Sequence, residues 1–275
     1  MKIFALSIVF LFSVFTLNAQ FYYQDILVTK QTNLQYNLYR SLETRKITAI
    51  SYDGDEISED FVLEQIFSVD GKQVVTRTAS INNEESYFIS SYNNNRLFHT
   101  VDSSKNAINS VTYTYDNSGN VLTIENTSKD FDGTFTNTEN HIWLYEDKVL
   151  PQSMLKIRNG TDTTFVRFGY DENGNLSEEK WEKKNNNIET YYYYYNNKNQ
   201  LTDVVRFNAR AQKLLPDFVF EYDNIGHLSQ MIQTQGGIAN YLVWKYFYND
   251  SGLKTRELVY NKNRNLLGRI EYKYK

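Results

Sequence analysis

Few residues in this sequence could do chemistry, and their spacing matches only one metal-binding pattern. The segment from Ser128 to Gly133, followed by Glu139, places Asp130, Asp132 and Glu139 at three ligand positions of an EF-hand calcium loop. The first position of that loop is Ser128 instead of an aspartate, and both flanking segments have the composition of strands. We therefore expect a hairpin turn here, with calcium binding as the alternative.

No other pattern in the sequence predicts catalysis. The three histidines, His99, His141 and His227, are far apart and form no paired zinc-ligand motif. There is no GxSxG elbow, no phosphate-binding glycine loop, no dinucleotide fingerprint and no cysteine. The neighbouring carboxylates Glu178 and Glu179 would point to opposite faces of a strand, so they would not act as an acid and base pair. We predict a protein that is not an enzyme and uses no cofactor, apart from calcium in the alternative interpretation.

Aromatic side chains are the candidate binding groups, because exposed rings and amides hold glycans or proteins. The candidates are Trp181, Tyr192 and Trp244. Each would bind a ligand only if it faces solvent, and for Trp244 we favour a place in the core. Trp181 is the one large aromatic residue in an otherwise charged strand.

The elements that would carry these residues are strands. The chain has 23 Tyr and 17 Phe among many Asn and Thr, and only 2 Pro. Aromatic and β-branched residues favour strands, whereas Asn, Asp and Gly favour turns. Outside the N-terminal apolar run, the segment 34–50 is the only place where we find room for a short helix.

One motif recurs along the chain: a strand that ends in Tyr, then Asp or Asn, a turn with Gly or Asn, and a branched apolar residue. Four full copies begin at Tyr115, Tyr170, Tyr195 and Tyr222; degenerate copies begin at Tyr92, Tyr145 and Tyr248, and a last one stops at Tyr274. The repeat length is about 26 residues, and a second turn such as Asn159-Gly160 divides each unit into two strands. We predict an all-β fold of tandem antiparallel hairpins that form an elongated, meandering sheet.

The chain is divided into three parts. Residues 1–19 have the features of a signal peptide: Lys2, an apolar run from Ile3 to Leu17, and Ala19 before the cleavage site. Residues 20–91 are diverged repeats or a capping region, with a separate small domain as the alternative, and 92–275 are the repeat array. We expect an exported protein of the periplasm or cell surface that does not span a membrane after cleavage.

Charge limits the partners. The chain has 29 basic and 33 acidic side chains, a net charge of −4, so a nucleic-acid partner is disfavoured.

The Tyr-Asp-x-x-Gly-x-Leu unit resembles the YD repeat of RHS-like proteins, which include bacterial surface and toxin-delivery proteins. The resemblance covers about residues 92–275. It implies a long β-sheet that encloses cargo or presents binding surfaces, in some members for carbohydrate. This chain is too short to close a cargo shell and is similar to small secreted repeat proteins of the Bacteroidetes type.

These features predict a binding or scaffold protein of the cell envelope, with a glycan or an envelope protein as partner. The alternative is an assembly protein whose terminal strand, 265–274, presents an unpaired edge to another sheet. A carbohydrate-active enzyme is the third interpretation.

Overall fold

Strands form where inward aromatic or aliphatic residues alternate with polar ones. In one such strand Tyr191 and Tyr193 are buried, whereas Tyr192 and Tyr194 point to the other face. The computed structural model describes residues 21–54, 56–80, 85–103, 107–146, 149–184, 186–234 and 240–275. The predicted signal peptide, 1–19, lies outside these residues.

The described residues contain one α-helix and eighteen strands. The helix is α1, Gln24–Ser41. The first nine strands are β1 Lys46–Asp53, β2 Glu56–Phe67, β3 Gln73–Ser80, β4 Glu85–Asn93, β5 Arg96–Ser103, β6 Ala107–Tyr115, β7 Val121–Asp130, β8 Thr136–Tyr145 and β9 Pro151–Arg158. The other nine are β10 Asp162–Tyr170, β11 Leu176–Lys183, β12 Asn186–Tyr195, β13 Leu201–Asn208, β14 Lys213–Tyr222, β15 Leu228–Thr234, β16 Tyr241–Tyr248, β17 Lys254–Asn261 and β18 Leu266–Tyr274.

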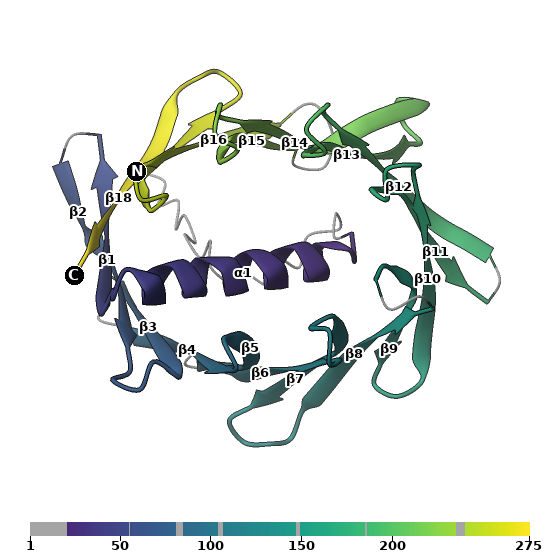
Figure 1. Cartoon of the computed structure of the whole chain (residues 1–275), viewed down its shortest axis with the longest axis horizontal. Coiled ribbons are helices and arrows are strands. Elements are labelled where there is room, and N and C mark those ends of the chain that lie inside the picture. The colour runs from purple at the N-terminus through teal and green to yellow at the C-terminus, as the bar shows by residue number, and fades with distance from the viewer. Residues whose placement is uncertain are drawn as a thin grey trace.

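The sheet closes on itself, so the predicted elongated open sheet is wrong although the all-β class and the antiparallel order are right. Each strand pairs with its neighbours in sequence, and β18 also pairs with β1 (Figure 1). Ala49 lies opposite Tyr272 and Thr48 opposite Lys273 across this seam. Closure satisfies the backbone groups that both terminal strands would otherwise leave unpaired. The predicted exposed edge at 265–274 is therefore also wrong, since β18 is paired with β17 and β1.

The N-terminal region contributes to the same sheet. β1 to β4 are hydrogen-bonded in the barrel between β18 and β5. The segment 20–91 thus supplies both the helix and the strands that complete the circle.

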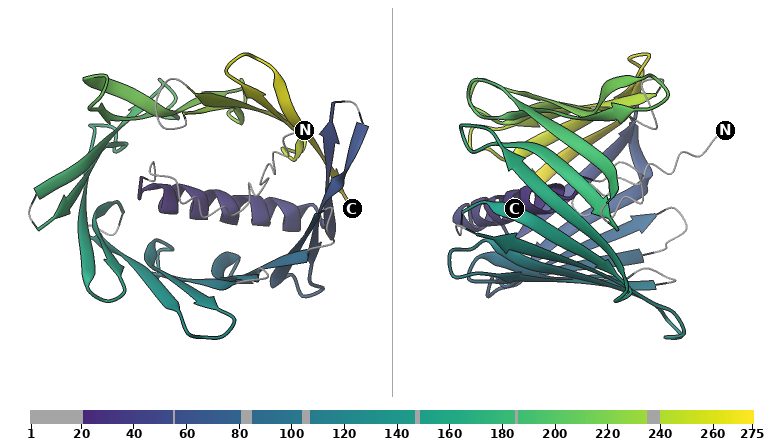
Figure 2. Two further views of the ribbon diagram at one scale, coloured as in Figure 1. Left: turned by 180° about the vertical axis from the view of Figure 1, so that it is seen from behind. Right: turned by 90° about the vertical axis from the view of Figure 1, so that its right-hand side faces the viewer.

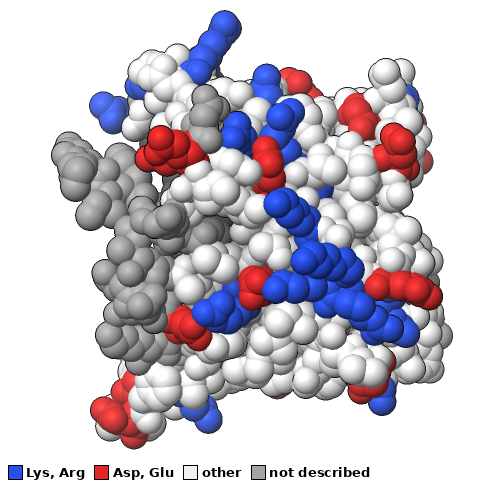
Figure 3. Space-filling model, turned by 90° about the vertical axis from the view of Figure 1, so that its left-hand side faces the viewer, with Lys and Arg blue, Asp and Glu red and all other residues white. Residues whose placement is uncertain are grey.

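Large residues line the inside of the barrel and polar residues cover much of the outside. Buried inward side chains include Trp143, Val166, Tyr191 and Trp244. On the outer face, Arg167 of β10 lies opposite Lys180 of β11, and Arg256 of β17 lies opposite Glu271 of β18. Figure 3 shows many charged side chains on the wall that contains β1, β2 and β18.

The Tyr repeat folds as a hairpin corner that recurs around one end of the barrel. The hydroxyl of Tyr222 donates to the carbonyl of Leu201 at 2.8 Å, and that of Tyr248 donates to the carbonyl of Leu228 at 3.0 Å. The same bond joins Tyr115 to Leu97, Tyr170 to Pro151, and Tyr274 to Lys254. A β-bulge directly precedes Tyr222 and Tyr248. At these five corners the repeated tyrosine thus ties its hairpin to the preceding one.

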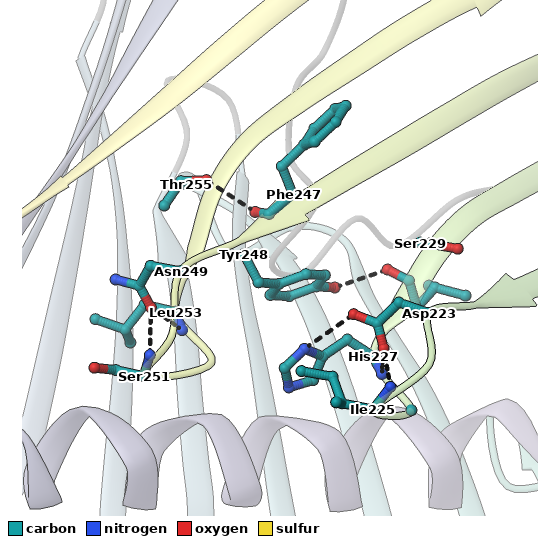
Figure 4. A network of polar contacts seen from close by, with 12 residues as sticks. Asp223, Ile225, His227, Ser229, Phe247, Tyr248, Asn249, Ser251, Leu253 and Thr255 are labelled. Carbon is teal, nitrogen blue, oxygen red and sulfur yellow. Dashed lines mark hydrogen bonds and ion pairs between the residues drawn. The ribbon is translucent and has the colours of Figure 1, made fainter.

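The residue after the tyrosine builds the turn. Asp223 Oδ1 accepts hydrogen bonds from the backbone N–H groups of Ile225 and His227 at 3.0 and 2.8 Å, and Gly226 takes a φ of +98°. Asn249 does the same for Ser251 and Leu253 (Figure 4). Figure 4 shows these two corners beside each other, next to α1. Asp and Asn are interchangeable here because either side-chain oxygen accepts both bonds.

Helix α1 lies inside the barrel and crosses it near one end (Figures 1 and 2). We expected a helix within 34–50, but the helix begins at Gln24, ends at Ser41 and is followed by β1. Its buried positions are Thr29, Thr32, Tyr36 and Tyr39, which have helical spacing but no aliphatic side chains. An apolar stripe is therefore missing from the pattern. Among the described residues, no helix has both the length and the apolar character needed to cross a membrane.

Candidate functional site

A cluster of buried polar groups lies where the chain enters α1, against the inner wall of β8 to β14. Phe21, Tyr22 and Tyr23, which we call the anchor, precede the helix. Their backbone bends so that the N–H groups of Tyr22 and Tyr23 both point at Glu179 of β11. Glu179 has no exposed surface. The anchor is thus held by a carboxylate in the middle of the inner wall.

Glu179 accepts four hydrogen bonds. Its Oε1 accepts from the Tyr22 amide at 2.7 Å and from the Trp181 indole at 2.5 Å. Its Oε2 accepts from the Tyr23 amide at 3.0 Å and from the Tyr193 hydroxyl at 2.6 Å. A carboxylate has about four lone-pair positions, so this one is fully used.

Burial raises the pKa of Glu179 above its ordinary value, and the four hydrogen bonds oppose that shift. A protonated carboxyl would bring one O–H donor into a site that already holds four donors, so the geometry fits the ionised form. No lone pair is left for proton transfer to a substrate. The role of Glu179 in this arrangement is to hold the anchor.

The anchor rings occupy aromatic sites on the same wall. Tyr22 lies 4.4 Å from the ring of Trp181 and 5.3 Å from the ring of His141, with the Lys156 ammonium 5.0 Å from its centroid. Phe21 packs edge-on against Tyr193 and Phe218, at 5.7 Å from each. These contacts bury Phe21 and Tyr22 almost completely.

An ion-pair cluster continues the contact into the first turn of α1. His141 of β8 bonds through Nδ1 to Asp25 of the helix and through Nε2 to Glu139 at 3.2 Å. Lys156 Nζ lies 3.0 Å from the second oxygen of Glu139. His141 thus links the helix to the wall between two carboxylates.

The pKa values follow from this placement. Burial acts to lower the pKa of His141, but the carboxylates of Asp25 and Glu139 outweigh it and raise the pKa to about 9. Burial acts to raise the pKa of Glu139, but His141 and Lys156 outweigh it and lower the pKa to about 2. Both groups are therefore charged at neutral pH.

The other end of the helix is fixed to the opposite side of the barrel. Tyr36 stacks on Tyr92 of β4 at 3.6 Å with a 4° angle between the rings, and its hydroxyl bonds to the carbonyl of Gly71. Arg40 Nη1 donates to Asn95 at 2.6 Å. The helix is therefore attached at both ends and bridges the lumen.

The structure places the three candidate binding aromatics in different surroundings. Trp181 faces inward, where it contacts the anchor and Tyr191. Trp244 also faces inward and is 6% exposed, so it lacks the solvent-facing position that a binding role requires. Tyr192 points outward, directly opposite Glu178 and Val205 on the neighbouring strands. Only Tyr192 lies on the outer wall.

The three calcium candidates do not come together. Asp130 accepts hydrogen bonds from Thr134 and from the Phe135 amide, and so caps the hairpin turn. Glu139 pairs in register with Asn126, about 13 Å along β7 from Asp130. The acidic side chain of Glu139 is engaged with His141 and Lys156. Within the described residues no group of three or more metal-binding side chains forms.

Comparison with solved structures finds porin-like proteins and toxin subunits. A porin-like protein from Bacteroides uniformis has 10% identity and a TM-score of 0.41, and the match covers 84% of this chain and 98% of that one. A second, from Bacteroides vulgatus, has 14% identity and a TM-score of 0.32, covering 84% of this chain and 99% of that one. The Photorhabdus luminescens Tc holotoxin pore has 9% identity and a TM-score of 0.31, covering 82% of this chain but only 18% of that one.

Likeness at this level does not bear on the function of this chain. No protein-family model matches the sequence. No curated protein sequence is similar to it either.

Sequence reasoning missed the anchor, Glu179 and the His141 cluster. We predicted that Glu178 and Glu179 point to opposite faces of their strand, and the structure confirms it. Nothing in the sequence of that strand marks the inward-facing Glu179 as the centre of a site. The one available signal was three consecutive aromatics at 21–23, which do not alternate as a strand of this barrel does. Together these residues form a binding site that the chain's own N-terminal segment occupies.

Proposed function

We propose that this chain is a non-catalytic binding or scaffold protein of the cell envelope, a plugged barrel whose outer wall faces water and holds a partner. The observation that carries the proposal is the division of chemistry between the two faces. The inside is lined with aromatic side chains and crossed by a helix attached at both ends, and the outside carries charges.

The outer wall does not suit lipid. A barrel in a bilayer needs an outward apolar band about 25 Å tall, and an Arg or Lys at its centre costs about 2–4 kcal/mol. Here Arg167, Lys180, Arg256 and Arg269 all point outward from within their strands. Several such costs would exceed the stability of an ordinary domain, so the charges support an aqueous environment.

A lumen crossed by a helix does not suit a channel. Barrels of sixteen to eighteen strands can leave an aqueous passage, but α1 lies across this one. The anchor and the Tyr36–Tyr92 stack hold the helix on opposite sides. The lumen thus serves to hold the helix, which leaves the outer wall and the turns as surfaces for a partner.

The YD-like repeat belongs to the same proposal. Its Tyr-to-carbonyl bond and its Asp or Asn turn recur with the same geometry at several corners, which supports a common repeated unit. A rigid scaffold built from such units would present side chains at fixed spacing. Export remains a prediction from residues 1–19.

Detergent phase separation and a conductance measurement test the proposed environment. The exported chain, expressed with its own leader, should partition into the aqueous phase of a detergent phase separation and should give no ion conductance in planar bilayers. Extraction only with detergent, together with stable conductance, would contradict the proposal.

A pull-down with the mature chain tests the binding role. Envelope extracts are separated into polysaccharide and protein fractions, and saturable retention of one component supports a binding protein. An outer-wall Tyr192→Ala variant and an inner-wall Trp244→Phe variant separate a surface contact from a change in the core. Absence of saturable retention from both fractions would argue against the binding role.

A further inference from the structure

One face of the outer wall gathers positive charge on a chain that is acidic overall. Six outward-facing cations on this face, which we call the basic band, are Lys245 of β16, Arg256 of β17, Arg269 and Lys273 of β18, Lys46 of β1 and Arg77 of β3. Figure 3 shows blue side chains running across this wall with fewer red ones among them. The concentration is a property of one face and not of the whole molecule.

Part of the band is not neutralised. Lys46 and Arg77 share Glu64, Arg77 also pairs with Glu85, and Arg269 lies 3.8 Å from Glu271. Across the described part of the chain, Lys245, Arg256 and Lys273 have no carboxylate within ion-pair distance, and Lys245 and Lys273 are exposed. Lys245 and Lys273 are therefore available to a ligand, whereas Arg256 is half-buried with its Nε covered.

Aromatic rings hold the arginines in place. The Arg256 guanidinium lies 4.2 Å from the ring of Phe247, and that of Arg269 lies 4.0 Å from the ring of Tyr52. A guanidinium held against a ring loses less rotamer freedom on binding than one that is free in solvent. Arginine recognises carboxylate through two parallel hydrogen bonds.

The shape of the band limits what can lie on it. The cations extend over six adjacent strands, so the arc is about 24 Å long, more than a quarter of the circumference. They are separated by uncharged residues such as Thr48 and Ile50 and by the carboxylates of Glu64 and Glu271, unlike a compact cluster that would hold a single phosphate. A flat bilayer touches a cylinder only along a line, whereas a flexible linear polymer follows its curve.

We propose that the basic band binds a linear polysaccharide that carries carboxylate groups at intervals. This inference rests on the proposed function and names the chemistry of the partner. Each carboxylate meets an Arg or Lys of the band, and release of counterions from the polymer makes the binding sensitive to salt.

Retention on immobilised polygalacturonate tests the proposal, with neutral dextran as the reference and anionic phosphatidylglycerol vesicles as the lipid arm. The band variant combines Lys245→Gln, Arg256→Gln and Lys273→Gln. The matched control combines Lys129→Gln, Arg167→Gln and Lys180→Gln on the outer face of β7, β10 and β11, which changes the net charge equally.

The wild-type chain should bind polygalacturonate more tightly than dextran, and the affinity should fall as salt is raised. The band variant should lose about tenfold in affinity, as expected for three exposed ion pairs, while the control stays near wild type. Protection of Lys245 and Lys273, but not Lys129, from acetylation by the bound polymer gives the same answer without a variant.

The proposal would be overturned if both variants lost the same affinity for polygalacturonate. It would also be overturned if the bound polymer did not change the acetylation of Lys245 and Lys273. Binding to the vesicles without binding to polygalacturonate would overturn it in favour of a lipid surface. If polygalacturonate is not retained but an envelope fraction still is, this inference fails while the proposed binding role stands.

Discussion

Glu179 accepts the hydrogen bonds that fix the N-terminal entry of the helix. It is fully buried and, among the residues that the structure describes, has no cationic partner, so its charge is stabilised by the four donors aimed at its two oxygens. Such a site tolerates little change, because each donor would be left unpaired in the barrel interior if the carboxylate were altered.

Replacing Glu179 by Gln should release the anchor. The amide nitrogen would face two donors and leave them without an acceptor, so we expect a loss of about 1–3 kcal/mol in the free energy of unfolding. Chemical unfolding and hydrogen exchange of residues 21–41 measure the two effects. Glu178→Gln, on the outer face of the same strand, should change stability by less than about 0.5 kcal/mol. Equal effects of both substitutions would show that Glu179 does not hold the helix.

The His141 cluster predicts how stability depends on pH. Because the pKa of His141 is raised from 6.5 to about 9, its contribution is complete below pH 6.5 and is lost as the pH rises through about 9. The contribution is on the order of 3 kcal/mol at most. Because the pKa of Glu139 is lowered from 4.5 to about 2, its contribution is present above pH 4.5 and is lost as the pH falls toward about 2.

Unfolding by denaturant between about pH 6 and pH 10 tests this prediction against His141→Gln. The wild type should lose stability across the alkaline part of the range, and the variant should show a flatter dependence there. An NMR titration of His141 that gives an ordinary pKa would contradict the assignment.

At the scale of elements, the hairpin corner was predictable and the helix was not. The spacing of Tyr, Asp or Asn, and Gly specified turns that Asp223 and Gly226 now form, because each residue type acts on its own backbone. Helix α1 instead buries Thr29, Thr32 and Tyr36, residues whose types favour strands or caps. Its conformation is set by packing inside the barrel, which no local pattern contains.

The corner tyrosine gives a prediction for the repeat. Tyr222→Phe removes the hydroxyl that donates to the Leu201 carbonyl and should cost about 1 kcal/mol in the free energy of unfolding. Tyr194→Phe is the matched control, because that ring points outward and is 50% exposed. Thermal and denaturant unfolding compare the two. A cost no larger than that of the control would mean that the tyrosine bond does not tie the hairpins together.

At the scale of the whole molecule, the sequence indicated strands and their order but not closure. Ile47 meets Tyr274 at the far end of the chain, and neither strand contains a signal for the other. The same limit applies to the predicted site residues. The alternation of side chains along the strands that carry Trp181 and Tyr192 could be predicted, but which face becomes the lumen depends on the closed barrel. Glu179 and the anchor are brought together only by that closure.

The central claim is a closed barrel, and disulfide cross-linking across the seam tests it most directly. The chain has no cysteine, so Thr48→Cys with Lys273→Cys introduces a single pair at directly opposed positions. Opposed residues in antiparallel strands have Cβ atoms about 4.5–5.5 Å apart, close to the geometry of a disulfide. Thr48→Cys with Lys245→Cys, in which the cysteines lie on strands that are not neighbours, is the control.

Mild oxidation should produce an intramolecular disulfide in the Thr48–Lys273 pair, seen as a mobility shift that reductant reverses, and none in the control. A failure of that pair to cross-link in the folded monomer, or cross-linking only between molecules, would mean that β1 and β18 do not meet and that the sheet is open.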